Sequence, residues 1–284
     1  MTVLVFGQSG QVARALARHM PDARFLGRSD VDLTEPKAIS DAIARHAPRA
    51  VINAAAYTAV DRAETEEPLA MAINAVAPGV MAEACAHRGI PLIHLSTDYV
   101  FDGSGEEAFS PDHPICPLNA YGRSKAAGEA AIAHSGATFG VLRTSWVFSA
   151  HGTNFVKTML RLSETRNRLT IVDDQRGGPT PAAAIAMACA TLERALSKTK
   201  SLSGIYHFSG QPDTSWAEFA KVIFQLSGRQ VEVQGIPSAD YPTPARRPLN
   251  SRLECRRTHE VFGLQQPDWR EALRDVLQEL EVLA

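Results

Sequence analysis

Tyr121 and Lys125 are the two residues whose types and spacing suggest chemistry most directly. They are four positions apart, so in a helix their side chains lie on the same face. A nearby ammonium would lower the pKa of the Tyr121 phenol from its ordinary value of about 10. Such a phenol is a usable general acid for the reduction of a carbonyl group. The same spacing is common on exposed helices, so the surrounding chain decides how it is interpreted.

Thr97 and Asp98 lie about 25 residues before this pair, in the stretch Ser96-Thr97-Asp98. The apolar run 91–95 predicts a strand, so these polar residues fall at its carboxyl end. Hydroxyl groups placed there can hydrogen-bond a substrate oxygen. Ser, Thr and Asp also form ordinary turns, but upstream of Tyr121 and Lys125 we interpret them as part of a site. The Pro- and Gly-rich segment 102–119 is typical of a loop that lines a site.

Gly7 and Gly10 follow the apolar run 3–6, and a helix is predicted over 14–19. Strand, Gly-rich turn and helix in this order are the context of a dinucleotide fingerprint, with Ala13 at the third position. The glycines let the backbone approach a pyrophosphate, and the helix N-terminus supplies N–H groups. The alternative is a tight turn without a ligand. Because the motif begins at the first strand, we predict a nicotinamide dinucleotide.

Arg28 follows the second predicted strand, which ends at 25–26. A cofactor without a 2′-phosphate is typically met here by an acidic residue. Arg28 therefore favours NADPH, with NADH as a second accepted coenzyme, unless it is an ordinary solvated arginine. The segment 241–251 is stiffened by prolines and carries Arg246 and Arg247, whose guanidinium groups suit a diphosphate.

Five strand–helix alternations within about 145 residues predict an α/β protein with a Rossmann-type doubly wound parallel sheet. We expect a nucleotide-binding domain over 1–148 and a smaller C-terminal α/β substrate domain over 149–284. The segment 182–208, a predicted helix and strand, is expected to rejoin the main sheet.

The 284 residues carry a net charge of −2, which gives no indication of a nucleic-acid or anionic-membrane surface. The four cysteines are widely spaced and indicate a reducing compartment rather than a disulfide frame or zinc site. No run of 18 apolar residues and no signal peptide is evident, so we predict a cytoplasmic protein without a membrane partner.

With these pieces aligned, the chain resembles the extended short-chain dehydrogenase/reductase superfamily and, more closely, the family of dTDP-4-dehydrorhamnose reductases. The resemblance covers essentially the whole chain. It is carried by the blocks NAAAYTAVD (53–61), STDYVF (96–101), RTSWVF (143–148), NFVKTMLRL (154–162) and YPTPARRPLNSRL (241–253).

The resemblance implies reduction of the C4 keto group of dTDP-4-dehydro-L-rhamnose, with Thr97, Tyr121 and Lys125 as the catalytic residues. Tyr121 would protonate the C4 oxygen, Thr97 would hold it, and Lys125 would bind the nicotinamide ribose and lower the pKa of Tyr121. The residues expected to bind the cofactor are Gly7, Gly10, Gln11, Val12, Arg28, Asp32, Leu33, Ala56, Tyr57, Thr58, Leu95, Tyr121 and Lys125. The residues expected to bind the dTDP-sugar are Thr97, Asp98, Tyr121, Trp146 and Arg246.

The chain departs from this family at one point. Some members are described as dimers bridged by Mg²⁺ through glutamates, and two matching positions here are Ala15 and Ala183, which leaves Glu279. Alanine offers no oxygen ligand for Mg²⁺. We therefore expect no metal site, and a monomer or weak homodimer.

Two other readings share the glycine turn and the Tyr–Lys spacing. One is a non-catalytic regulatory subunit, like the β subunit of methionine adenosyltransferase, and the other is a sugar-nucleotide epimerase or dehydratase. Thr97 and the blocks around Trp146 and 242–250 favour the reductase. A dehydratase would be expected to carry more acidic residues at the end of the strand than Asp98.

Overall fold

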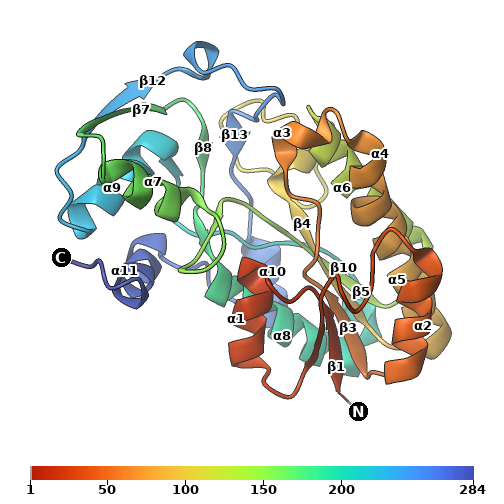
Figure 1. Cartoon of the computed structure of the whole chain (residues 1–284). Coiled ribbons are helices and arrows are strands. Elements are labelled where there is room, and N and C mark those ends of the chain that lie inside the picture. Colours follow the sequence, from red (N-terminus) through yellow and green to blue (C-terminus); the bar gives the residue numbers. More distant parts are fainter. Residues whose placement is uncertain (1) are drawn as a thin grey trace.

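The computed structural model describes residues 2–284 and is built around a six-stranded sheet (Figure 1). Its strands run in the order β10-β5-β4-β3-β1-β2, and every neighbouring pair is parallel. The strands are β1 (Val3–Phe6), β2 (Arg24–Leu26), β3 (Ala50–Asn53), β4 (Leu92–Thr97), β5 (Phe139–Thr144) and β10 (Gly204–His207). The predicted Rossmann-type parallel sheet is confirmed.

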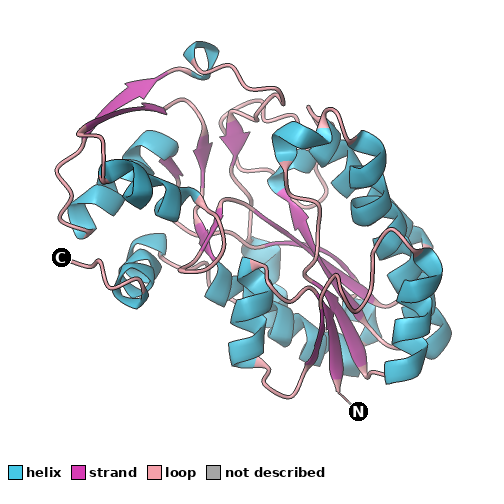
Figure 2. Ribbon diagram, in the orientation of Figure 1, coloured by secondary structure: helices cyan, strands magenta, loops and turns pink. Residues whose placement is uncertain are grey.

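Helices cover both faces of this sheet (Figure 2). The helices of the first 200 residues are α1 (Gln11–His19), α2 (Pro36–His46), α3 (Val60–Ala63), α4 (Glu67–Met71), α5 (Ala77–Arg88), α6 (Ala120–His134), α7 (Phe155–Ser163) and α8 (Ala182–Lys198). Short π or 3₁₀ turns occupy η1 (Ala72–Val76), η2 (Asp98–Val100), η3 (Lys200–Leu202) and η4 (Ser238–Asp240). The chain closes with α9 (Trp216–Leu226), α10 (Arg256–Phe262) and α11 (Trp269–Glu279).

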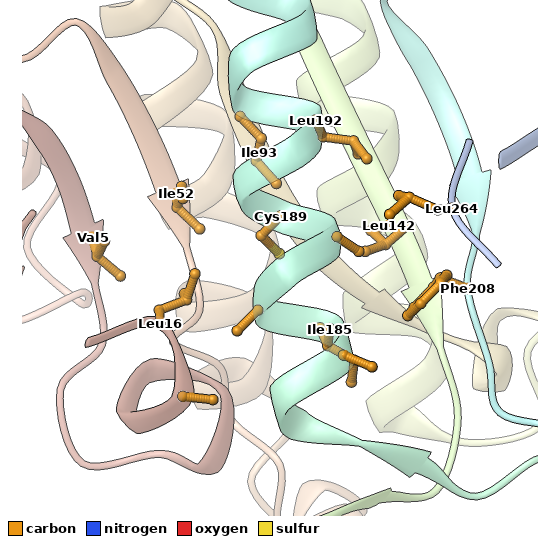
Figure 3. Packing of buried hydrophobic residues seen from close by; sticks show 14 of the residues in the cluster. Val5, Leu16, Ile52, Ile93, Leu142, Ile185, Cys189, Leu192, Phe208 and Leu264 are labelled. Atoms are coloured by element: carbon orange, nitrogen blue, oxygen red, sulfur yellow. The ribbon is translucent and has the colours of Figure 1, made fainter. Parts of the chain in front are cut away.

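The strands are continuous apolar runs in the sequence because helices bury both faces of the sheet. On one face, α1 and α8 pack on β1, β3, β4 and β5. Figure 3 shows Ile185, Cys189 and Leu192 of α8 near Ile93 and Leu142 of the sheet. On the other face, α2, α5 and α6 enclose a second cluster with the alternate side chains of the same strands. The two layers hold the sheet rigidly, so the ends of its strands are fixed positions.

A topological switch point lies between β1 and β3, because the chain passes from β1 to β2 on one side and to β3 on the other. Ligands of open α/β sheets bind outside the carboxyl ends of the strands at such a point. Gly7, Ala54, Asp98 and Ser145 each directly follow one of these ends. The topology thus gathers the segments that carry the predicted site.

Small sheets and helices from the C-terminal half stand over this edge (Figure 1). Their strands are β6 (Val147–Phe148), β7 (Arg168–Val172), β8 (Arg176–Gly177), β9 (Thr180–Pro181), β11 (Thr214–Ser215), β12 (Glu232–Ile236) and β13 (Asn250–Ser251). A separate apolar cluster fills the space among α7, α9, α11 and β7. The predicted boundary at 148/149 stays a prediction, whereas α8 and β10 do lie on the main sheet.

One continuous helical stretch, Glu67–Arg88, is long and apolar enough to cross a membrane by length and composition alone. Half of its apolar window is buried inside the protein. Within it, Asn74 is buried and hydrogen-bonds Tyr57 and Ser124. These contacts are those of a helix in a protein core.

Candidate active site

Helix α6 begins where its first turn is capped by Asn119, whose Oδ1 accepts the Gly122 N–H at 2.8 Å. Position 122 requires glycine, because a Cβ there would overlap the carbonyl oxygen of Tyr99. The cap and this close approach hold the first turn of α6 against η2. Tyr121 and Lys125 are thereby fixed on one helix face beside the carboxyl end of β4.

Lys125 is buried, and its ammonium group points to β4. Nζ donates to the carbonyl oxygen of Leu95 at 2.6 Å and lies 3.0 Å from Nε2 of His94. Burial lowers the pKa of Lys125 to about 8, although the charge of Glu129 opposes the shift. The predicted cofactor residue Leu95 therefore contacts Lys125 through its backbone.

The prediction that Lys125 lowers the pKa of Tyr121 was wrong for this structure. Burial raises the pKa of Tyr121 to about 12; the neighbouring Thr97 hydroxyl opposes the rise, and the charge of Asp98 adds to it. The physical reason is that Nζ of Lys125 is engaged by Leu95 and His94 rather than by the phenol. Thr97 is the group that favours ionisation of Tyr121.

Thr97 and Asp98 are both buried at the end of β4. The Thr97 hydroxyl donates to Asp98 Oδ1 at 3.1 Å and accepts the Tyr99 N–H at 3.2 Å. Asp98 Oδ2 and the hydroxyl of Thr144, at the end of the neighbouring strand β5, are buried without a hydrogen-bond partner among residues 2–284. Burial raises the pKa of Asp98 to about 6, against hydrogen bonds from Ser251 and Thr97. Unpaired polar atoms at this depth mark a place where a polar ligand fits.

Trp146 lies two residues beyond the end of β5 and has a left-handed backbone, φ +48°. Its ring stacks on Trp216, with centroids 3.6 Å apart and planes at 12°. A Cβ on Gly177 would lie 2.9 Å from the same ring. A non-glycine residue held at positive φ is strained and persists where its surroundings fix it. Trp216 was not anticipated from the sequence, because α9 is far from Trp146 along the chain.

The glycine turn has the shape that a dinucleotide requires. Gly7 has φ +114°, and a Cβ there would lie 3.1 Å from the Ala54 carbonyl carbon at the end of β3. Gly10 is the N-cap of α1 and offers no side-chain cap, and the first turn of α1 has no acidic residue. The N–H groups of that turn are thus available to an anion, so the residues present fit a pyrophosphate.

Gln11 and Val12 face the protein rather than solvent. The Gln11 amide donates to the Val147 carbonyl at 3.3 Å and accepts from Ser149 and Asn154, each at 2.9 Å. Val12 packs against the cluster under α1. Gln11 thereby connects the glycine turn to the start of the C-terminal half, a role that the sequence motif did not reveal.

The segment after β2 places Arg28 in solvent at the edge of the sheet. Its charge reaches Asp32, whose pKa is lowered mainly by hydrogen bonds from the Thr34 backbone and hydroxyl, both to Oδ1. The Leu33 side chain packs against the core under α2 and α5. Of these three predicted cofactor residues, Arg28 is the one with a free side chain among residues 2–284.

After β3, Ala56 and Thr58 are exposed and Tyr57 is partly buried. The Tyr57 hydroxyl donates to Glu66 at 2.6 Å, and its backbone is paired with Asn74. Because β3 pairs with β1 in parallel, the segment 56–58 and the glycine turn both follow strand ends at the same edge of the sheet.

Arg246 and Arg247 differ in the structure, although the sequence treats them alike. Arg247 pairs with Asp61 at 2.8 Å. Arg246 is exposed, and its side chain makes no hydrogen bond or ion pair among residues 2–284, while its carbonyl accepts from Asn119 at 2.8 Å. Arg246 is thus held near the start of α6 with its guanidinium group available.

Glu279, the remaining position of the expected metal set, forms an ion pair with Arg18 at 2.5 Å and lies 3.3 Å from His151. Residues 2–284 contain no group of three or more His, Cys, Asp or Glu side chains arranged to hold a metal ion. Whether the protein binds Mg²⁺ stays a prediction.

The fold, the glycine turn and the Thr97–Tyr121–Lys125 group define the class as a Rossmann-type α/β protein with a short-chain-dehydrogenase-like site. The chain belongs to the family described as the RmlD substrate binding domain, whose profile matches residues 1–282. The resemblance inferred from the sequence is therefore confirmed.

Named relatives agree with this family. The chain is 45% identical over 283 residues to a dTDP-4-dehydrorhamnose reductase of Sinorhizobium fredii, with 96% of each chain covered. It is 42% identical to the protein of the same name from Burkholderia thailandensis, covering 98% and 100%. Among solved structures, dTDP-4-dehydrorhamnose reductase from Bacillus anthracis in complex with NADP matches with a TM-score of 0.91 and 34% identity, covering 98% and 99%.

Proposed function

We propose that this protein reduces the C4 keto group of dTDP-4-dehydro-L-rhamnose to give dTDP-L-rhamnose, with NADPH as the reductant. The observation that carries the proposal is the presence of Thr97, Tyr121 and Lys125 together at the switch-point edge of a chain that matches reductases of this name over nearly its full length. The dinucleotide-shaped turn at Gly7 and Gly10 supports the cofactor class.

The chain's residues divide the work of the reaction. A bound reduced nicotinamide supplies the hydride to C4 of the sugar. The glycine turn and the first turn of α1 hold the pyrophosphate, and Lys125 holds the nicotinamide ribose. Thr97 orients the C4 oxygen, and Tyr121 delivers a proton to that oxygen as negative charge develops on it.

Asp98, Trp146 and Arg246 bind the nucleotide sugar in this proposal. Asp98 Oδ2 is the unpaired buried acceptor and suits a sugar hydroxyl. Trp146 offers an aromatic face beyond the end of β5. Arg246 offers a free guanidinium group for the diphosphate.

Arg28 is proposed to bind the 2′-phosphate and so to favour NADPH over NADH. Arg28→Ala should weaken NADPH binding by about tenfold and NADH binding by less than about twofold, because one charge-assisted contact is lost only with the phosphate. Arg45→Ala removes another exposed arginine, at the end of α2, and serves as the control. Fluorescence titration with both coenzymes measures the effect. Equal weakening of both would make Arg28 a bystander.

The assay for the proposed reaction follows NADPH oxidation with dTDP-4-dehydro-L-rhamnose generated in situ. The sugar is prepared with and without the 3,5-epimerase that sets its L configuration. Oxidation only when the epimerase is present supports the reductase and its stereochemical requirement. Tight coenzyme binding without oxidation of NADPH or NADH would favour a regulatory subunit, and interconversion of sugars without net oxidation would favour an epimerase.

We further propose that the protein acts in the cytoplasm as a monomer or weak homodimer without Mg²⁺. The Arg18–Glu279 ion pair supports the last point, because it occupies the carboxylate that would otherwise be free to bind a metal.

A further inference from the structure

Asn53, His94 and Lys125 form a buried polar chain that crosses from β3 through β4 to α6. Strand register pairs Asn53 directly with His94. Asn53 Nδ2 lies 3.0 Å from His94 Nδ1, and His94 Nε2 lies 3.0 Å from Lys125 Nζ. None of the three side chains is more than 1% exposed. His94 and Asn53 have no part in the mechanism above, yet His94 contacts Lys125 directly and Asn53 contacts His94.

The direction of these hydrogen bonds is set at the Asn53 end. Oδ1 of Asn53 accepts the backbone N–H of Ala55 at 3.2 Å, so the NH₂ group of the amide faces His94. An amide NH₂ can only donate. Nδ1 of His94 must therefore be the acceptor and carry no proton.

The His94 ring is neutral, because burial and then the charge of Lys125 hold its pKa well below the ordinary value. A neutral imidazole carries one proton, which is then on Nε2 and faces Nζ of Lys125. Nζ can accept that hydrogen bond only as an uncharged amine, while it donates to the Leu95 carbonyl at 2.6 Å. In this form each hydrogen bond from Asn53 through His94 to Lys125 and Leu95 has one donor and one acceptor.

Protonation of Lys125 is incompatible with these hydrogen-bond directions. An ammonium group has no lone pair, so His94 must present Nε2 as the acceptor and move its proton to Nδ1. Nδ1–H then faces the NH₂ of Asn53, donor against donor. Turning the amide would relieve this conflict but would leave the Ala55 N–H facing an NH₂ group. One buried donor stays unsatisfied in either arrangement.

We propose that Asn53 and His94 are positioning residues that present the Lys125 amine with a hydrogen-bond donor, so that Lys125 takes up its proton only when the His94 ring changes tautomer. The inference deepens the proposed function, because it concerns the lysine assigned to the nicotinamide ribose. It makes the charge beside the cofactor depend on two residues outside the catalytic group.

The other groups near Lys125 act through charge and not through this chain. Glu129, one turn further along α6, favours the ammonium form, and its carboxylate is itself paired with Arg143 of β5 at 2.7 Å. Tyr121 lies one turn before Lys125 on the same helix and is uncharged near neutral pH, because its pKa is raised to about 12. Burial and Glu129 thus act on the Lys125 pKa in opposite directions, and the proposal adds the hydrogen bond with His94.

The test is ¹⁵N NMR of the histidine rings from roughly pH 6 to pH 10, because ring nitrogen shifts distinguish the two tautomers. The His94 signals, one of nine sets, are assigned by their loss in His94→Gln. We expect the Nε2–H tautomer at high pH and the Nδ1–H tautomer once Lys125 is protonated, with a midpoint at the Lys125 pKa of about 8. His94 should stay neutral throughout.

Two variants make the test specific. In Lys125→Met, His94 should keep a single tautomer at every pH, because the titrating partner is gone. In Asn53→Asp, both carboxylate oxygens accept, so His94 should stay in the Nδ1–H form. The ¹³Cε titration of Lys125, one of six lysines, should then move up by about one pH unit or more.

An Nδ1–H tautomer at about pH 10, or a tautomer unchanged by pH in the wild-type protein, would overturn the proposal. The wild-type and Lys125→Met spectra decide this even if Asn53→Asp does not fold. Because these readouts need no turnover, failure of this inference is distinguishable from failure of the reductase assignment. As a functional readout, His94→Gln, which can still donate to Lys125, should retain at least about tenfold more NADPH turnover than His94→Leu.

Discussion

At the scale of single residues, the phenol of Tyr121 and the Nζ group of Lys125 are not paired with each other. Tyr121 and Lys125 share a helix face, but Nζ of Lys125 is engaged by Leu95 and His94. Burial raises the pKa of the Tyr121 phenol to about 12, and the Thr97 hydroxyl is the neighbouring group that opposes this rise. Tyr121 is therefore fully protonated at neutral pH. That suits the proposed role of Tyr121, which is to give a proton to a developing alkoxide.

Tyr121→Phe should lower kcat by about 10²-fold or more, because the proton donor is lost. The dissociation constant of NADPH should change by less than about twofold, because the contacts at the glycine turn remain. Stopped-flow turnover and fluorescence titration measure the two quantities. Tyr206→Phe is the control, because it removes a buried phenol whose hydroxyl donates to Leu202 on another part of the fold. Activity retained in Tyr121→Phe would remove this residue from the mechanism.

Burial of the Asp98 carboxylate lowers the stability of the folded protein when this group is ionised. Its pKa is raised from 3.8 to about 6, so the folded state binds the proton more tightly than the unfolded state. The stability associated with this group is present below the unfolded pKa and is lost as pH rises through about 6. The buried Oδ2 atom of Asp98 has no hydrogen-bond partner among residues 2–284, so no hydrogen bond at this atom offsets the burial of the charge.

Asp98→Asn should therefore raise the free energy of unfolding at pH above 6 by about 3 kcal/mol, while lowering turnover. The gain should shrink as pH falls through 6 and vanish near the unfolded pKa, where the wild-type carboxyl is protonated in both states. Urea unfolding of both proteins above and below this range measures the difference. A gain independent of pH would show that charge burial is not its cause.

At the scale of elements, glycines set how closely α6 packs. Gly122 meets the carbonyl of Tyr99, and Gly128 meets the carbonyl of Asn74 in the π segment η1. Both approaches leave no room for a Cβ. They fix the helix that carries Tyr121 and Lys125 relative to β4 and to the segment that binds Tyr57.

Gly128→Ala should destabilise the protein by about 1–3 kcal/mol through overlap with the Asn74 carbonyl. Gly79→Ala, in α5, is the matched control, because its added methyl would meet only the Ala131 methyl at 3.1 Å. Both changes gain the same helix propensity of about 1 kcal/mol. Urea unfolding isolates the packing difference, and equal effects would contradict the role assigned to Gly128.

Elements with a local signal could be predicted from the sequence. The β1–turn–α1 unit and the helix over 120–134 follow from apolar patterning, glycines and capping residues within a few positions. The π segment η1, between α4 and α5, has no local signal; there the Asn74 carbonyl packs against Gly128 of α6. The two-residue strands β8, β11 and β13 were missed, because they exist only through pairing with one another.

Some residues of the candidate site could likewise be predicted from local sequence signals, and others could not. Thr97, Tyr121 and Lys125 could be named from motifs, whereas Asn53 and His94 meet Lys125 through strand register, which no local pattern states. The predicted direction of the Tyr121 pKa shift failed for a related reason. Spacing on a helix gives the face that a side chain occupies but not the partner at its tip.

At the scale of the molecule, Gln11 and Arg18 are two of the side chains that connect the glycine turn and α1 to the C-terminal half. Gln11 joins the glycine turn to Val147, Ser149 and Asn154. Arg18 of α1 joins Glu279 of α11. Under the proposed function, the Gln11 contact lies beside the pyrophosphate position, and we expect cofactor binding and sugar binding both to depend on it.

Gln11→Ala should lower the free energy of unfolding by about 1–2 kcal/mol, because the buried partners Ser149 and Asn154 lose an acceptor. It should also raise KM for the nucleotide sugar, which a residue serving only the cofactor would not do. Gln8→Ala is the control, since Gln8 lies on the same turn and makes no side-chain hydrogen bond among residues 2–284. Chemical unfolding and steady-state kinetics together give both quantities. A change in NADPH affinity alone would contradict a shared dependence on this contact.

The most direct measurement of the central claim is transfer of deuterium from 4-deuterated NADPH to the sugar, observed by NMR of the product. The account predicts deuterium at C4 of dTDP-L-rhamnose, with transfer lost in Tyr121→Phe. Deuterium at another carbon, or sugar conversion without deuterium, would contradict the assignment of this site as a C4 reductase.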